Sequence, residues 1–282
     1  MGIIKEFLGI GGYTRKPEGY MSWQHITFVL ILMTAMVALA VYLGLINRNK
    51  SDKHKNKVLI WSAFLINGFE IFKIVVLCIR GNDPMAWLYS LPLFLCSIQL
   101  ITIPLAAFSR GRVRDASLDF VMIFGILGAV LGTIGAGQNY NAYPVLSMDN
   151  VVSGITHCIS GFASLYIAFA KMKSMKKSNV LISFGIITVV STLAYITNIT
   201  IDYNYMFLMA GDGTPYDILY NLVGGHKVFY PLSVVALLFI YIALFYLIYY
   251  GVKGYQTKKA AKKEVAEHST PTIQEDVVIN NV

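Results

Sequence analysis

Long apolar runs separated by short, charged loops constrain the fold of this chain more than any other feature of its sequence. A helix needs about 20 mostly apolar residues to cross a hydrocarbon core about 30 Å thick, and seven runs come close to that length. They cover residues 26–45, 58–78, 92–108, 117–136, 151–170, 180–198 and 229–250. With 56% hydrophobic and only 13% charged residues, the composition is that of a membrane protein. The runs therefore predict an all-α, polytopic membrane protein with seven transmembrane helices.

The distribution of Lys and Arg predicts how these helices are oriented. Seventeen of the 23 Lys and Arg residues lie in the loops 46–57, 109–116 and 171–179 and in the tail after Tyr250. Five lie on the opposite side, and Lys73 lies inside a span. Because cytoplasmic loops are enriched in Lys and Arg, we predict an outside N-terminus and a cytoplasmic C-terminus. The net charge of +8 follows from this topology and from anionic inner-leaflet lipid, so we expect no nucleic-acid partner.

The chain divides into three parts. Residues 1–24 form an outer segment, for which an interfacial helix and a frayed terminus both remain open. The apolar stripe of such a helix would consist of Ile3, Ile4, Phe7 and Leu8. Residues 25–252 form the seven-helix membrane domain. Residues 253–282 are too polar to bury a core of their own, so we predict a disordered cytoplasmic tail.

Polar residues inside the spans gather toward the predicted outer side. A polar side chain within a span costs several kcal/mol unless it meets a partner or a cavity, so each marks a candidate site. Asn67, Glu70 and Lys73 recur at intervals of three and so share one helix face. The remaining candidates are Cys96, Gln99, His157, Asn198, Asn204 and His226. We therefore predict a polar site in the outer half of the membrane.

Depth brings Cys96 and His157 together. At 1.5 Å per residue both lie roughly 8 to 9 Å below the outer ends of their helices, and Glu70 lies about 12 Å deep. A thiol, an imidazole and a carboxylate are the parts of a nucleophile, its base and an orienting group. Simpler readings remain open, because buried cysteines are usually inert and Glu70 with Lys73 can form a purely structural ion pair.

Other sequence features predict packing rather than chemistry. Three cysteines form neither a disulfide framework nor a metal-ligand pattern, and we expect no metal and no cofactor. A run of four glycines in the fourth span has the spacing of a small-residue helix face, which we interpret as a packing surface. It consists of Gly125, Gly128, Gly132 and Gly135.

Three stretches of the sequence resemble the YwaF-like integral membrane proteins of bacteria. They are Leu91-Pro92-Leu93-Phe94-Leu95-Cys96-Ser97, Thr156-His157 and Asn204-Tyr205-Met206-Phe207-Leu208. The family looks related to a vertebrate transmembrane acyltransferase that builds ether phospholipids and, more distantly, to the androgen-induced membrane hydrolases of fatty-acid esters. The resemblance spans roughly residues 20–250 and implies that Cys96 takes up an acyl chain with His157 as its base. It also implies a bacterial cytoplasmic membrane. Bacterial members commonly have a histidine where Phe94 stands, so no second-histidine role carries over.

These observations lead to one expected function and two alternatives. We expect a membrane acyltransferase that takes an acyl chain from a phospholipid and passes it to a lipid or lipoprotein acceptor; water as the acceptor would make it a hydrolase. The oxyanion would be stabilised by Gln99 with Asn198 or Asn204. A transporter or receptor for a small solute would also explain the polar cluster, although the sequence shows no internal repeat. A purely structural membrane protein is the third possibility.

Overall fold

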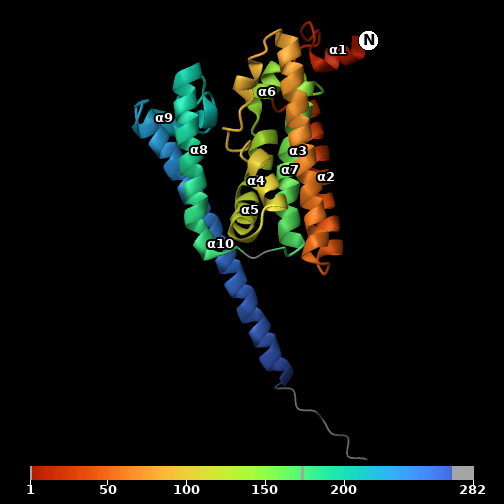
Figure 1. The fold of residues 1–282 in the computed structure, drawn as a ribbon, viewed down its shortest axis with the longest axis vertical. Coiled ribbons are helices and arrows are strands. Elements are labelled where there is room, and N and C mark those ends of the chain that lie inside the picture. The colour runs from red at the N-terminus through yellow and green to blue at the C-terminus, as the bar shows by residue number, and fades with distance from the viewer. Residues whose placement is uncertain (1, 173–174, 269–282) are drawn as a thin grey trace, which may run out of the picture. The chain divides into compact units, whose positions relative to one another are not determined.

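A computed structural model describes residues 2–172 and 175–268. In this part of the chain every regular element is a helix (Figure 1). Among these residues, those up to Ile242 form one compact unit, and those from Ala243 on form a second. The prediction of an all-α fold is confirmed.

Six helices in the described part of the chain are long and apolar enough to cross a membrane. They are α2 (Trp23–Asn47), α3 (Asp52–Gly81), α5 (Gly111–Thr133), α7 (Met148–Phe169), α8 (Val180–Ile201) and α10 (Phe229–His268). The shorter elements are α1 (Gly2–Leu8), η1 (Ala86–Ser90), α4 (Gln99–Phe108), α6 (Gly137–Ala142), η2 (Lys177–Asn179), η3 (Tyr205–Phe207) and α9 (Asp217–Leu222). The six long helices correspond to six of the seven predicted spans, which confirms a multi-pass membrane protein.

The predicted span 92–108 is not a continuous helix. Only α4, of 10 residues, is helical there, and its length of about 15 Å is half the hydrocarbon thickness. The residue before a proline is disfavoured in the α conformation, and Leu91 before Pro92 is extended, with ψ of 149°. Turns occupy the stretch between Pro92 and α4. The third predicted span is therefore corrected to a turn segment followed by a short helix.

This segment nevertheless runs back along α3. The Asn67 side chain, near the middle of α3, donates to the Leu100 carbonyl at 3.2 Å. The Asn56 side chain, near the start of α3, donates to the Ala107 carbonyl at 2.6 Å. Since the order of contacts is reversed between the two elements, α4 is antiparallel to α3.

Helix α7 lies at the centre of the bundle, where α2, α3 and α5 all pack against it (Figure 1). Small residues allow these close approaches: a Cβ added at Gly125 of α5 would lie 2.5 Å from the backbone oxygen of Ser160 on α7. At the next residue of α7, a Cβ added at Gly161 would lie 2.4 Å from the Met36 sulfur of α2 and 2.6 Å from the Ala129 Cβ of α5. Gly125 thus has the packing role expected of the glycine face.

The two ends of the chain differ in part from expectation. Helix α1 forms, but Phe7 and Leu8 pack against a buried cluster of Val76, Met148 and Val152, alongside Phe69. Ile3 and Ile4 of the same expected stripe remain widely exposed. Half of the stripe is therefore packed against the helix bundle, and the other half is exposed. At the other end α10 continues to His268, so residues 253–268 are helical rather than without structure. The prediction of disorder for residues 269–282 lies outside the described residues.

Candidate functional site

Cys96 and His157 meet, although they come from different elements. Cys96 lies in the turn segment before α4, and His157 lies in the middle of α7. Nδ1 of His157 lies 2.7 Å from the Ser153 carbonyl oxygen, one turn earlier on the same helix. A carbonyl can only accept a hydrogen bond, so Nδ1 carries the proton and Nε2 presents its lone pair. The Cys96 thiol and the His157 imidazole are neighbours that interact electrostatically.

Two glycines of α5 leave the space that this pair occupies. A Cβ added at Gly132 would lie 1.9 Å from Cδ2 and 2.1 Å from Nε2 of His157, far inside any allowed contact. One turn earlier, a Cβ at Gly128 would lie 3.7 Å from the Cys96 Cβ, which is an ordinary contact. The glycine face expected only to pack helices therefore also accommodates the imidazole ring.

A cavity of about 990 Å³ adjoins the pair, at the upper end of the size range of small-molecule sites. Its walls come from α3, η1, the turn segment, α6, α7 and the loop after α8. Cys96 and His157 both border it and are both partly exposed. A ligand in this cavity can therefore reach the thiol.

A second, much smaller pocket of about 40 Å³ lies against the same pair. Five residues border both spaces: Lys73, Cys96, Ser97, Ser153 and His157. The Cys96–His157 pair thus borders both a large cavity and a small one.

Glu70 and Lys73 form an ion pair, with Nζ and Oε1 2.5 Å apart. Lys73 borders both cavities, and its charge acts on Cys96 and His157. Glu70 borders the small pocket, and its carboxylate is engaged by Lys73. The contact that orients the His157 ring comes from the Ser153 carbonyl. The structural ion pair considered from the sequence therefore forms, and it forms beside the reactive pair.

Asn67 and Gln99 support the turn segment and do not border either cavity within the described residues. Asn67 donates to the carbonyls of Ala63 and Leu100 and thereby ties α4 to α3. Gln99 is fully buried; its Oε1 accepts from the Thr102 hydroxyl at 3.0 Å, and its Nε2 has no partner among the described residues. Neither side chain lines the cavity from which a ligand would reach Cys96.

Three candidates remain: Asn198, Asn204 and His226. Of these, only Asn204, in the loop after α8, borders the cavity. Asn204 borders it and donates to the Ala210 carbonyl and to Asp212. Asn198 is buried and bonds both the amide and the carbonyl of Tyr205, which fixes the loop. His226 is exposed, and its Nδ1 accepts from the backbone amides of Val228 and Phe229 at the start of α10, at 3.2 and 3.4 Å. Asn198 and His226 are not among the described residues that line the cavity.

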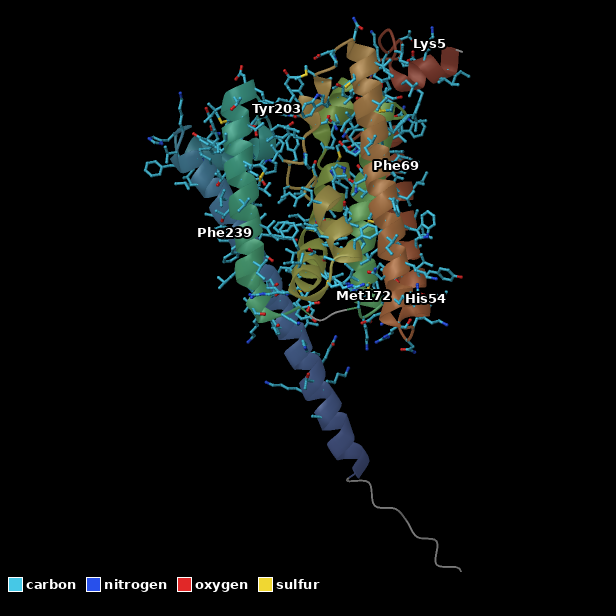
Figure 2. The ribbon with its side chains drawn as sticks, in the orientation of Figure 1. Lys5, His54, Phe69, Met172, Tyr203 and Phe239 are labelled. Carbon is cyan, nitrogen blue, oxygen red and sulfur yellow. The ribbon has the colours of Figure 1, made fainter. Side chains whose placement is uncertain are left out.

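The two longer stretches behind the family resemblance contact each other. The Phe94 ring packs against Tyr205 and Phe207, with centroids 4.9 Å and 6.0 Å apart. The buried Tyr205 hydroxyl donates to the Leu88 carbonyl and accepts from the Leu91 amide at 3.0 Å. Tyr203, labelled in Figure 2, packs against Tyr89 at 5.3 Å. The loop after α8 therefore holds the segment that carries Cys96.

This loop has a strained backbone. Met206 and Phe207 both have a φ of +56°, a conformation that costs roughly 1 to 3 kcal/mol for a residue other than glycine. Such strain persists only where the surroundings impose it, and it concentrates near functional sites. Here the Asn198 clamp and the Tyr205 hydroxyl supply that constraint.

A buried ion pair that sequence reasoning missed forms part of the cavity wall. Arg80 at the end of α3 makes two hydrogen bonds to Asp149 at the start of α7, at 2.6 and 2.9 Å. The Tyr13 hydroxyl donates to Asp149 at 2.5 Å, and burial with this bond raises the pKa of Tyr13 to about 12. The only sequence signal is a pair of opposite charges at the ends of two predicted spans, with Arg80 just after 58–78 and Asp149 just before 151–170.

Comparison with known proteins gives one match. A model of the TMEM164 family matches residues 20–249, most of the 282-residue chain. The chain belongs to the TMEM164 family. The matched range includes Cys96, His157 and the loop after α8. No curated protein and no solved structure matches the chain.

Within residues 2–172 and 175–268, no group of three or more His, Cys, Asp or Glu side chains could hold a metal ion.

Proposed function

We propose that this TMEM164-family protein is a membrane acyltransferase that moves a fatty acyl chain from a phospholipid to a lipid or lipoprotein acceptor through an acyl-Cys96 intermediate. One observation carries the proposal: Cys96 and His157 are neighbours at the wall of a cavity of about 990 Å³, and Nδ1 of His157 lies 2.7 Å from the Ser153 carbonyl oxygen. A nucleophile beside a base that a third group orients is the arrangement covalent catalysis requires. The resemblance to YwaF-like proteins implies the same two residues.

The reaction would proceed in two half-reactions. Nε2 of His157 accepts the Cys96 proton, and the thiolate attacks the ester carbonyl carbon of the donor lipid. The ester C–O bond breaks, His157 returns the proton to the leaving oxygen, and an acyl thioester remains on Cys96. The acceptor hydroxyl or amine then gives its proton to His157 and attacks the thioester, and the C–S bond breaks. The Lys73 ammonium next to the pair favours the negative charge that develops in both steps.

A receptor or transporter for a small polar solute is the second candidate. The cavity wall carries the Arg80–Asp149 ion pair and the Asn204 amide, which are groups that could bind such a solute. This function would need no nucleophile. Covalent modification of Cys96 therefore distinguishes the two candidates.

Intact-protein mass spectrometry after incubation with a phospholipid tests the proposal. The wild-type protein should gain the mass of one acyl chain, whereas Cys96→Ser and His157→Ala should not. Cys158→Ser and Cys78→Ser serve as controls, because Cys158 packs in a cluster with Met36 and Ala129 and Cys78 borders neither cavity within the described residues. An unmodified wild-type protein together with a fully active Cys96→Ser variant would exclude an acyl-enzyme.

We further propose that the chain crosses a cell membrane seven times, with the N-terminus outside. The charge distribution supports this orientation, and the turn segment with α4 would provide the seventh crossing, because irregular backbone is tolerated at membrane depth where it lines a cavity. Three exposed positions can report it: Lys53, Asp83 and Arg112. A membrane-impermeant thiol reagent should label Asp83→Cys in intact cells, but Lys53→Cys and Arg112→Cys only after permeabilisation. Labelling of Asp83→Cys and Arg112→Cys from the same side would refute the seventh crossing.

A further inference from the structure

The small pocket beside Cys96 and His157 has the size of a water site. Its volume is about 40 Å³, whereas sites for small molecules have roughly 300 to 1,000 Å³ and a cavity needs about 10 to 15 Å³ to hold one water. It admits a few waters but excludes an acceptor lipid. The 990 Å³ cavity that borders the same pair is large enough for lipid.

The walls of the small pocket are polar enough to hold water. They include the Glu70 carboxylate, the Lys73 ammonium and the hydroxyl groups of Ser97, Ser153, Thr156 and Ser160. The Thr156 and Ser160 hydroxyls donate to α7 carbonyls, at 2.9 and 3.2 Å, which leaves their oxygen lone pairs free to accept. A buried water makes two to four hydrogen bonds, and this wall offers both acceptors and the Lys73 donor.

The pocket opens onto the atoms that would react. Cys96 and His157 border both spaces, so a thioester on Cys96 can be approached from the lipid cavity by an acceptor and from the small pocket by water. Nε2 of His157 is the base available to either nucleophile, since Nδ1 is bonded to Ser153.

We propose that this pocket holds the water that hydrolyses acyl-Cys96, so that the enzyme also releases free fatty acid. The inference rests on the proposed acyl-enzyme. Nε2 of His157 takes a proton from the water as its oxygen bonds to the thioester carbonyl carbon. The C–S bond breaks, and the proton passes from His157 to the Cys96 sulfur. The products are a fatty acid and the free thiol, with no other reactant required.

A matched pair of substitutions at Ser160 tests the role of the pocket. Ser160 borders only the small pocket and is buried. Ser160→Val places two methyl groups where one hydroxyl stood and should exclude the water, whereas Ser160→Ala keeps the space open. Ser183→Val on α8 is the control, because the Ser183 hydroxyl is buried and has no partner within the described residues.

The measurement is the partition of acyl chains in full-length protein supplied with a labelled phospholipid and a lysophospholipid acceptor. In ¹⁸O-water the released fatty acid should carry one ¹⁸O atom. Ser160→Val should lower the ratio of fatty acid to transferred product by about tenfold or more, because its methyl groups fill the space that the water needs. Ser160→Ala and Ser183→Val should leave the ratio close to the wild-type value.

The outcomes separate the two proposals. If Cys96 is acylated in Ser160→Val but the ratio does not change, the pocket is not the source of the water and the acyltransferase proposal stands. If the ratio falls equally in Ser160→Ala, the volume argument is wrong. If wild-type Cys96 takes up no acyl chain, both proposals fail.

Discussion

Gly132→Ala should disable the reaction by moving His157. The added methyl group would lie 1.9 Å from Cδ2 of the ring, and the shortest ordinary contact is 3.4 Å, so the ring must shift by about 1.5 Å. Nδ1 would then lose its 2.7 Å contact with Ser153, or Nε2 its approach to Cys96. Because a misplacement of about 1 Å can cost on the order of 100-fold in rate, we expect acylation of Cys96 to slow by about 100-fold or more.

Gly128→Ala is the matched control, one turn away on the same face of α5. Its added methyl group would lie 3.7 Å from the Cys96 Cβ, which is an allowed contact. Alanine also favours a helix over glycine by about 0.5 to 1 kcal/mol. This variant should therefore keep its acylation rate and be as stable as the wild type. The assay is the time course of the acyl adduct by intact-protein mass spectrometry, with thermal unfolding measured in parallel.

A double-mutant cycle separates positioning of the ring from helix packing. In a His157→Ala background there is no ring to displace, so Gly132→Ala should have little further effect on the melting temperature. If Gly132 served helix packing instead, Gly132→Ala would lower the stability equally in the wild-type and His157→Ala proteins. A Gly132→Ala protein that acylates Cys96 at the wild-type rate would refute the proposed geometry.

Two further predictions concern the groups that hold the site together. Tyr205→Phe leaves the Leu88 carbonyl and Leu91 amide without their hydroxyl partner, which should cost about 1 to 3 kcal/mol; an unchanged melting temperature would show that the hydroxyl does not hold the turn segment. Arg80→Met leaves the Asp149 carboxylate, whose side chain is only 10% exposed, with the Tyr13 hydroxyl but without its cationic partner, and should cost about 1 to 3 kcal/mol. The double variant Arg80→Met/Asp149→Leu should recover much of that loss in thermal unfolding; no recovery would argue against a buried ion pair.

Hydropathy predicted the helices but could not predict the break in one of them. Six spans form because any apolar run of sufficient length is stable as a helix in lipid, whatever its neighbours. The run 92–108 meets the same criterion, yet its first part is irregular. Other elements supply hydrogen-bond partners at its start; the backbone amide of the preceding Leu91, for example, donates to the Tyr205 hydroxyl. A count of apolar residues contains no information about such partners.

Depth predicted which reactive side chains could meet. Cys96 and His157 were matched because the rise per residue of a helix and the position of the membrane surface give a height for every residue. Height leaves the direction around each helix axis undetermined. From depth alone, Asn67 and Gln99 were candidates for the same site as Cys96. In the structure the Asn67 side chain bonds the Leu100 carbonyl, the Gln99 side chain bonds the Thr102 hydroxyl, and neither residue lines the cavity.

The sequence by itself determined the helical membrane architecture, the approximate depth of the polar residues and the pairing of Cys96 with His157, because these depend on composition and on local geometry. Tertiary structure alone decided that Ser153 rather than Glu70 orients the imidazole, that Gly132 leaves room for it, and that Arg80 binds Asp149. These contacts depend on how helices far apart in the chain are rotated against one another, and that rotation is set by the packing of the whole bundle.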